Sequence, residues 1–175
     1  MLQMLTTMGF AAKGESYGAT LNKIMFYSPY EWVMIHDHDI FLCHPEWYRL
    51  ITENIEKAEN PGLLTCVTNR IGNSEQKSNY AGIGNSNNLT LHRQYAIDVE
   101  ERDLIKANKP ISGLVMVTSK KAWKEAGGFR ESGIIGVDND YHRRIEKAGF
   151  ESYIMSNVYV YHWYRQPIEG YNETD

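Results

Sequence analysis

The chain has 175 residues, near the usual size of one domain, so we expect a single domain over residues 1–175. Hydrophobic residues make up 42% and charged residues 23%, a balance that excludes intrinsic disorder. The net charge of −4 excludes a broad basic surface, and we therefore expect no nucleic-acid partner.

Membrane and export signals are lacking in the sequence. It holds no apolar run of 18 residues and no charged segment followed by an apolar signal core, which predicts no membrane span. The two cysteines, Cys43 and Cys66, do not have the spacing of a metal site. We expect a cytoplasmic protein with reduced thiols.

The first half of the chain alternates between strand and helix patterns. In chain order we predict a strand at 2–8, a helix at 15–27, a strand at 31–35, a helix at 45–58 and a strand at 63–68. The run at 31–35 is continuous and apolar, as in strands buried on both faces. Alternation of this kind predicts an α/β protein with a mainly parallel sheet.

The second half begins with a segment rich in Gly, Asn and Ser, residues 70–90, which we interpret as a long functional or disordered loop. The remaining predicted elements are a polar helix at 92–106, a strand at 111–118, helices at 119–125 and 138–148, one or two strands at 152–162, and a frayed tail after about 166.

Two carboxylates, Asp37 and Asp39, directly follow the predicted strand at 31–35. Ligands of α/β sheets bind beyond the carboxyl ends of strands, so this position favours a site. Carboxylate oxygens suit Mg²⁺ or Mn²⁺, ions that commonly bridge a protein to substrate phosphates. His36 and His38 add two flanking imidazoles. Solvated acids at a strand end are the competing interpretation, because the pattern is short.

A second acidic cluster, Asp138 and Asp140, begins the predicted helix at 138–148. The helix dipole stabilises acids at this end, so capping is their simplest interpretation. Only one of them can be the cap, which leaves the other free to face a site. The last predicted strand ends in His162 among aromatic residues, where a single histidine is more often structural than a ligand.

In chain order these segments resemble glycosyltransferase family 2, which has the GT-A fold. The resemblance covers about residues 17–163 and is carried by six strings: WVMIHDHDIF at 32–41, SGLVMV at 112–117, AGGFRE at 126–131, GVDNDYHRR at 136–144, AGF at 148–150 and VYH at 160–162. It implies a GT-A-like, Rossmann-like three-layer sandwich around the sheet.

The resemblance also implies a metal-dependent transfer of a sugar from a nucleotide-diphosphate sugar to a glycan or other hydroxyl acceptor. It makes Asp37, Asp39 and His162 ligands of Mn²⁺ or Mg²⁺, and Asp138 the catalytic base. The residues it implies for donor or substrate binding are Asn22, His38, Gly113, Asp140, Arg144 and Trp163.

The chain departs from the family pattern in two places. Fewer residues than usual precede Asp37, so it resembles a short member or one truncated at the N-terminus. Val137 stands where the family has Glu before the base, which leaves inversion or retention open. A degenerate transferase that only binds nucleotide or glycan, a metal-dependent phosphohydrolase, and a scaffold with solvated acids are alternatives. The donor nucleotide, the acceptor and the oligomeric state are also open.

Overall fold

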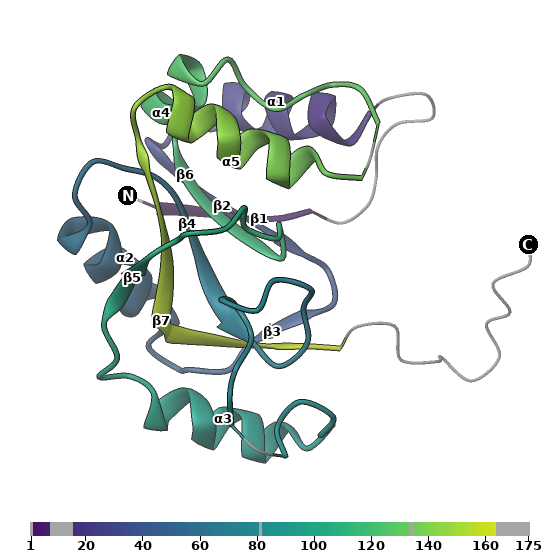
Figure 1. Ribbon diagram of the computed structural model, residues 1–175, viewed down its shortest axis with the longest axis vertical. Coiled ribbons are helices and arrows are strands. Elements are labelled where there is room, and N and C mark those ends of the chain that lie inside the picture. The colour runs from purple at the N-terminus through teal and green to yellow at the C-terminus, as the bar shows by residue number, and fades with distance from the viewer. Residues whose placement is uncertain (1, 8–15, 81, 134, 164–175) are drawn as a thin grey trace, which may run out of the picture.

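The computed structural model describes residues 2–7, 16–80, 82–133 and 135–163 (Figure 1). Within these ranges the chain forms a mixed α/β fold around one sheet. Its elements, in order, are β1 (Leu2–Thr7), α1 (Tyr17–Tyr27), β2 (Trp32–Asp37), β3 (Ile40–Leu42), α2 (Trp47–Lys57), β4 (Pro61–Thr68), α3 (Leu89–Asp98), β5 (Leu104–Lys106), β6 (Val115–Ser119), α4 (Lys120–Glu125), α5 (Val137–Lys147) and β7 (Glu151–His162). None of the helices in these ranges has the length and apolar character needed to cross a bilayer.

The sheet has the strand order β1-β2-β6-β4-β7-β3, and β5 pairs with β7 outside this path. Only β1 with β2 and β4 with β7 are parallel; the other four described pairings are antiparallel. The α/β class is confirmed, but the prediction of a mainly parallel sheet is wrong. The reason is β6, which enters between β2 and β4 and runs opposite to both, a direction that local patterns do not encode.

Both faces of the sheet are buried, as the apolar run of β2 predicts. Val33 and Ile35 pack with residues of α1, α4 and α5, while Met34 points to the other face and packs with Leu50 and Ile51 of α2. In Figure 1, α1, α4 and α5 lie together on one side of the sheet. Since successive side chains of a strand alternate between faces, a strand covered on both sides is mostly apolar along its length.

One further expectation changes, the helix at 92–106. The predicted helix at 92–106 ends at Asp98, and its last residues instead form β5, an edge strand on β7. The final segment is one continuous strand, β7. Residues 70–80 and 82–88 form turns and loop, as expected, and Gln76 and Ile83 within them are fully buried. The expected tail after 166 lies outside the described residues.

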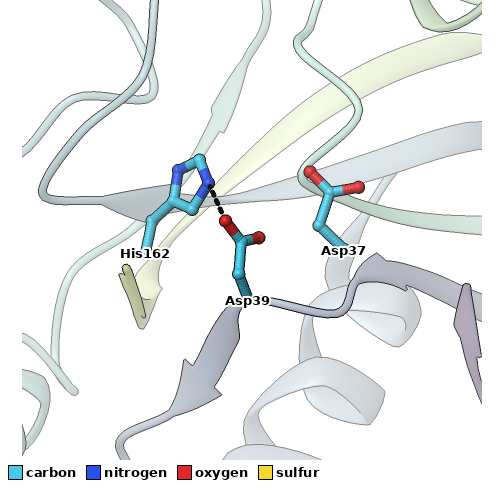
Figure 2. Close-up of side chains that lie close together, drawn as sticks. All are labelled: Asp37, Asp39 and His162. Atoms are coloured by element: carbon cyan, nitrogen blue, oxygen red, sulfur yellow. Dashed lines mark ion pairs between the residues drawn. The ribbon is translucent and has the colours of Figure 1, made fainter. Parts of the chain in front are cut away.

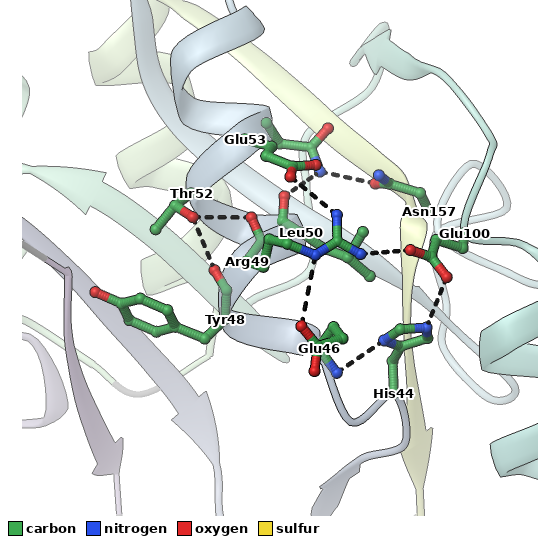
Figure 3. A network of polar contacts seen from close by, with 10 residues as sticks. His44, Glu46, Tyr48, Arg49, Leu50, Thr52, Glu53, Glu100 and Asn157 are labelled. Carbon is green, nitrogen blue, oxygen red and sulfur yellow. Dashed lines mark hydrogen bonds and ion pairs between the residues drawn. The ribbon is translucent and has the colours of Figure 1, made fainter.

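A polar network joins α2 to two connections of the chain (Figure 3). The Arg49 guanidinium binds Glu53 one turn along α2 and Glu100 after α3. The buried His44 accepts a hydrogen bond from the Glu46 amide through Nδ1, so its Nε2 donates to Glu100 at 3.2 Å. The network ties the segment that follows β3 to α2 and to the connection after α3.

Candidate metal centre and active site

Asp37, Asp39 and His162 come together at one edge of the sheet (Figure 2). Asp37 is the last residue of β2, and Asp39 lies in the turn to β3. His162 ends β7 and is paired in register with Ile40, so antiparallel pairing of β3 with β7 carries it beside Asp39. One potential ligand atom from each side chain lies within 4.8 Å of the other two.

The ring of His162 is held in one orientation. Its Nδ1 lies 2.7 Å from the carbonyl oxygen of Arg70, which can only accept, so Nδ1 carries the proton. In the neutral ring Nε2 is then a lone-pair nitrogen, and it lies 3.3 Å from Oδ2 of Asp39. Two acceptors at this distance require a second proton or a cation between them. A histidine whose other nitrogen donates to a backbone carbonyl is the usual arrangement at metal sites.

The electrostatics of Asp37 indicate a crowded anionic site. Burial, together with the negative charge of Asp39, raises the pKa of the Asp37 carboxyl from its ordinary 3.8 to about 6. The charge of Asp138 contributes in the same direction, which places a third carboxylate within electrostatic reach. A divalent cation would offset this repulsion and favour the ionised carboxylates.

Asp138 bonds both the segment just before β6 and the first turn of its own helix. Its Oδ2 accepts from the Gly113 amide at 2.7 Å, and its Oδ1 accepts from the Asn139 amide at 2.8 Å. Neither Asp138 nor Asp140 caps α5, since the N-cap is Gly136 without a side-chain bond. The neighbouring Leu114 carbonyl accepts from the Asp37 amide at 3.0 Å. One short segment of chain therefore connects Asp138 to the metal candidates.

Gly113 lets this carboxylate approach the backbone. A Cβ atom at position 113 would lie 2.9 Å from Cβ of Asp138, closer than side chains pack. Any larger residue would displace Asp138 or the start of β6. Gly113 thus supports the site in two ways. It leaves room for Asp138, and its amide donates to the Asp138 carboxylate.

Asn22 has all of its amide hydrogen-bonding capacity used within the protein. Its Nδ2 donates to the Phe129 carbonyl and to Glu131, and its Oδ1 accepts from the Trp123 indole and the Phe129 amide, all at 2.8–2.9 Å. This clamps α1 to the turn after α4, a structural role that accounts for an asparagine here. Its expected part in nucleotide binding stays a prediction.

The other expected substrate-binding residues lie in varied surroundings. Asp140 and Arg144 form an ion pair with each other at 2.6 Å along α5. His38 is exposed in the turn between Asp37 and Asp39. Trp163 is 48% exposed and stacks on Phe41 at 6.1 Å between ring centroids. Their contacts with substrate stay predictions.

Two residues that support the site gave no signal in the sequence. The fully buried Asn69 accepts from the His162 amide at 2.8 Å and donates to its carbonyl at 3.3 Å. Arg70 supplies the carbonyl that orients the ring. A main-chain carbonyl is present at every residue, so its use as a partner is invisible in sequence, and only the meeting of β4 with β7 reveals it.

Comparison with known proteins shows a similar fold in a solved structure but no matching sequence family. No protein-family model matches the chain, and no curated protein matches it. Among solved structures, it resembles a mannosyltransferase from Pyrobaculum calidifontis in complex with GDP-Man and Mn²⁺. The TM-score is 0.54 at 16% identity, over 88% of this chain and 37% of the other. The chain thus spans well under half of that protein's length, and at this identity the likeness extends to the fold alone.

Proposed function

We propose that this protein is a metal-dependent glycosyltransferase that moves a sugar from a nucleotide-diphosphate sugar to a hydroxyl acceptor. The observation that carries the proposal is the convergence of Asp37, Asp39 and His162, with the Nδ1 proton of His162 committed to a backbone carbonyl. Two carboxylates and one imidazole form a donor set that suits Mn²⁺ or Mg²⁺. The fold likeness to a transferase that binds GDP-Man and Mn²⁺ supports the same reaction class.

In this proposal Asp37, Asp39 and His162 would hold the ion, at the ends of β2 and β7. A bound Mn²⁺ or Mg²⁺ would supply Lewis acidity and charge neutralisation toward a diphosphate leaving group. Nε2 of His162 and Oδ2 of Asp39 already lie 3.3 Å apart. Asp37 completes the set when its carboxyl is ionised. The low exposure of His162 keeps its ring fixed while Asp39, 30% exposed, stays open to ligand.

Asp138 is proposed as the base that takes the proton of the acceptor hydroxyl. The amides of Gly113 and Asn139 orient its carboxylate. Its negative charge is felt at Asp37, so base and metal candidates belong to one electrostatic neighbourhood. A carboxylate held in place by fixed backbone donors needs little reorganisation during the reaction.

The test is ligand-induced stabilisation. Thermal unfolding of the wild type is measured in EDTA, with Mn²⁺, and with Mn²⁺ plus GDP or UDP, alongside Asp39→Ala and the surface control Asp98→Ala. A ligand that binds only the native state raises the midpoint by mass action. The proposal expects a nucleotide effect that requires Mn²⁺, vanishes in Asp39→Ala and persists in Asp98→Ala.

Turnover separates the candidate functions. Transfer of sugar from the responding nucleotide sugar supports the transferase. Stabilisation without turnover on any donor supports a protein that only binds, and release of free sugar or phosphate without transfer supports a hydrolase. If neither Mn²⁺ nor nucleotide shifts the midpoint of the wild type, the metal-dependent function is refuted.

A further inference from the structure

A cavity lies beyond the end of β4, next to the site. Its volume is about 580 Å³, and its lining includes Asn69, Arg70, Lys77 and Asn85. Asn69 and Arg70 both form hydrogen bonds with His162. The cavity and the metal candidates therefore share a wall made of the strand end of β4.

The cavity is positively charged in a protein whose net charge is −4. Arg70 and Lys77 both line it, and within the described ranges neither forms an ion pair; none of the described lining residues is acidic. The nearby acid in sequence, Glu75, is used elsewhere, since it accepts from the amides of Asn108 and Lys109. Two cations in one concave site without a counter-charge favour an anionic ligand.

The walls are held by buried hydrogen bonds, so the cavity is part of the folded structure. Gln76 is fully buried and bonds Thr65 and both backbone groups of Ser112. The backbone of Thr68 bonds Gln76 and Ser78, which places Lys77 beside the end of β4. On the opposite wall, Arg70 Nε donates to the Gly84 carbonyl at 2.6 Å, which holds the loop at Gly84 in place.

The two ring nitrogens of His162 have different partners. Nε2 of His162 faces Asp39, whereas Nδ1 faces the carbonyl of Arg70. The two nitrogens of an imidazole point in diverging directions, so the Arg70 carbonyl and Asp39 lie on different sides of the ring. In the proposed function a diphosphate would bind with the ion beside Nε2, which would leave the cationic cavity for a second ligand.

We infer that this cavity binds an anionic group, a phosphate or a carboxylate, carried by the acceptor. The inference rests on the proposed function and adds a substrate class to it. The acceptor then has two parts, a hydroxyl that reaches Asp138 and a negative group that Arg70 and Lys77 hold. Because the side chain of Lys77 is exposed while its neighbours Gln76 and Ser78 are buried, its charge can be changed without disturbing the fold.

The experiment measures anion binding to the full chain in EDTA, where no metal contributes. Midpoints of thermal unfolding are followed at rising inorganic phosphate and constant ionic strength. The variants are Lys77→Gln, Lys77→Arg and Lys77→Glu, with Lys57→Gln on the exposed end of α2 as the matched control. We expect about fivefold weaker phosphate binding in Lys77→Gln, from the Coulomb energy of one solvated charge pair. Lys77→Arg retains binding, and Lys77→Glu abolishes it.

Three further probes identify the anionic group. Glucose 6-phosphate, glucuronate and glucose present a phosphate, a carboxylate and no charge on comparable rings. A response to glucose 6-phosphate alone assigns the cavity to phosphate, and a response to both charged sugars assigns it to anions generally. A response to glucose equal to the others overturns the inference.

Independent readouts separate this inference from the proposed function. The anion site is overturned if the wild type and Lys77→Glu bind phosphate equally well. It is also overturned if Lys57→Gln loses as much phosphate affinity as Lys77→Gln. The response to Mn²⁺ and GDP decides the transferase separately. Phosphate displaced by saturating Mn²⁺ and GDP also overturns the inference, because the cavity would then belong to the donor. Lys77-dependent phosphate binding in a protein that ignores Mn²⁺ and GDP supports an anion site and refutes the transferase.

Discussion

Replacing Asp37 by Asn should stabilise the metal-free protein and remove its response to metal. Asn has nearly the shape of Asp but carries no charge. Burial and the charge of Asp39 raise the pKa of the Asp37 carboxyl to about 6 from its ordinary 3.8, so the folded protein binds this proton more tightly than the unfolded chain. Ionised Asp37 therefore costs folding free energy, which Asp37→Asn avoids.

The size and sign of the effect follow from these two pKa values. Below pH 3.8 the carboxyl is protonated in both states and costs nothing. The cost grows as pH rises between 3.8 and 6 and is complete above 6. If the whole difference between the two pKa values were expressed as folding free energy, ionised Asp37 would cost about 3 kcal/mol. Because Asp37 is only partly buried, we expect about 1–2 kcal/mol at pH 7.5, falling to about one third of that at pH 4.5.

Urea unfolding in EDTA at pH 7.5 and pH 4.5 measures this difference directly. Asp98→Asn is the control, because Asp98 is exposed on α3 and its carboxylate, among the described residues, accepts only from Gln94 one turn before it. A gain at pH 7.5 that shrinks at pH 4.5, in Asp37→Asn alone, is the expected result. No gain at pH 7.5, or the same gain at both pH values, would refute the description of a crowded anionic site. With Mn²⁺ added, the wild type should be stabilised and Asp37→Asn should not.

Three other substitutions test how the site is positioned. Gly113→Ala places a Cβ 2.9 Å from Cβ of Asp138 and should lower stability by about 1–3 kcal/mol and reduce turnover, with Gly72→Ala, in open space, as the control in urea unfolding. Asn22→Ala leaves the Trp123 indole and the Phe129 backbone without partners and should cost about 2–4 kcal/mol; an additional loss of nucleotide affinity by calorimetry would identify a binding role as well. Gly18→Ala puts a Cβ 1.8 Å from a backbone carbonyl oxygen, and a native-like unfolding midpoint would contradict the close packing of α1.

The local patterns of the sequence predicted most elements and the carboxylate pair. The continuous apolar run before Asp37 indicated a buried strand, and β2 is buried on both faces. Ser119 belongs to a residue type that favours helix N-caps, and it caps α4 by accepting from the Ala122 amide at 3.0 Å. Such features depend on residues close together in the chain, whose side chains must match a strand or helix period whatever the rest of the fold does.

Only the tertiary structure decided strand direction, the partners of His162 and the setting of Asp138. Whether β6 runs with or against β2 depends on pairing between distant segments, which leaves no local period in the sequence. The partners here are main-chain groups, the carbonyl of Arg70 and the amide of Gly113. Nearly every residue has both groups, so the amino-acid sequence does not distinguish these two as partners. The sequence thus determined which side chains the protein can bring to a site, while long-range strand pairing determined which of them meet and in what orientation.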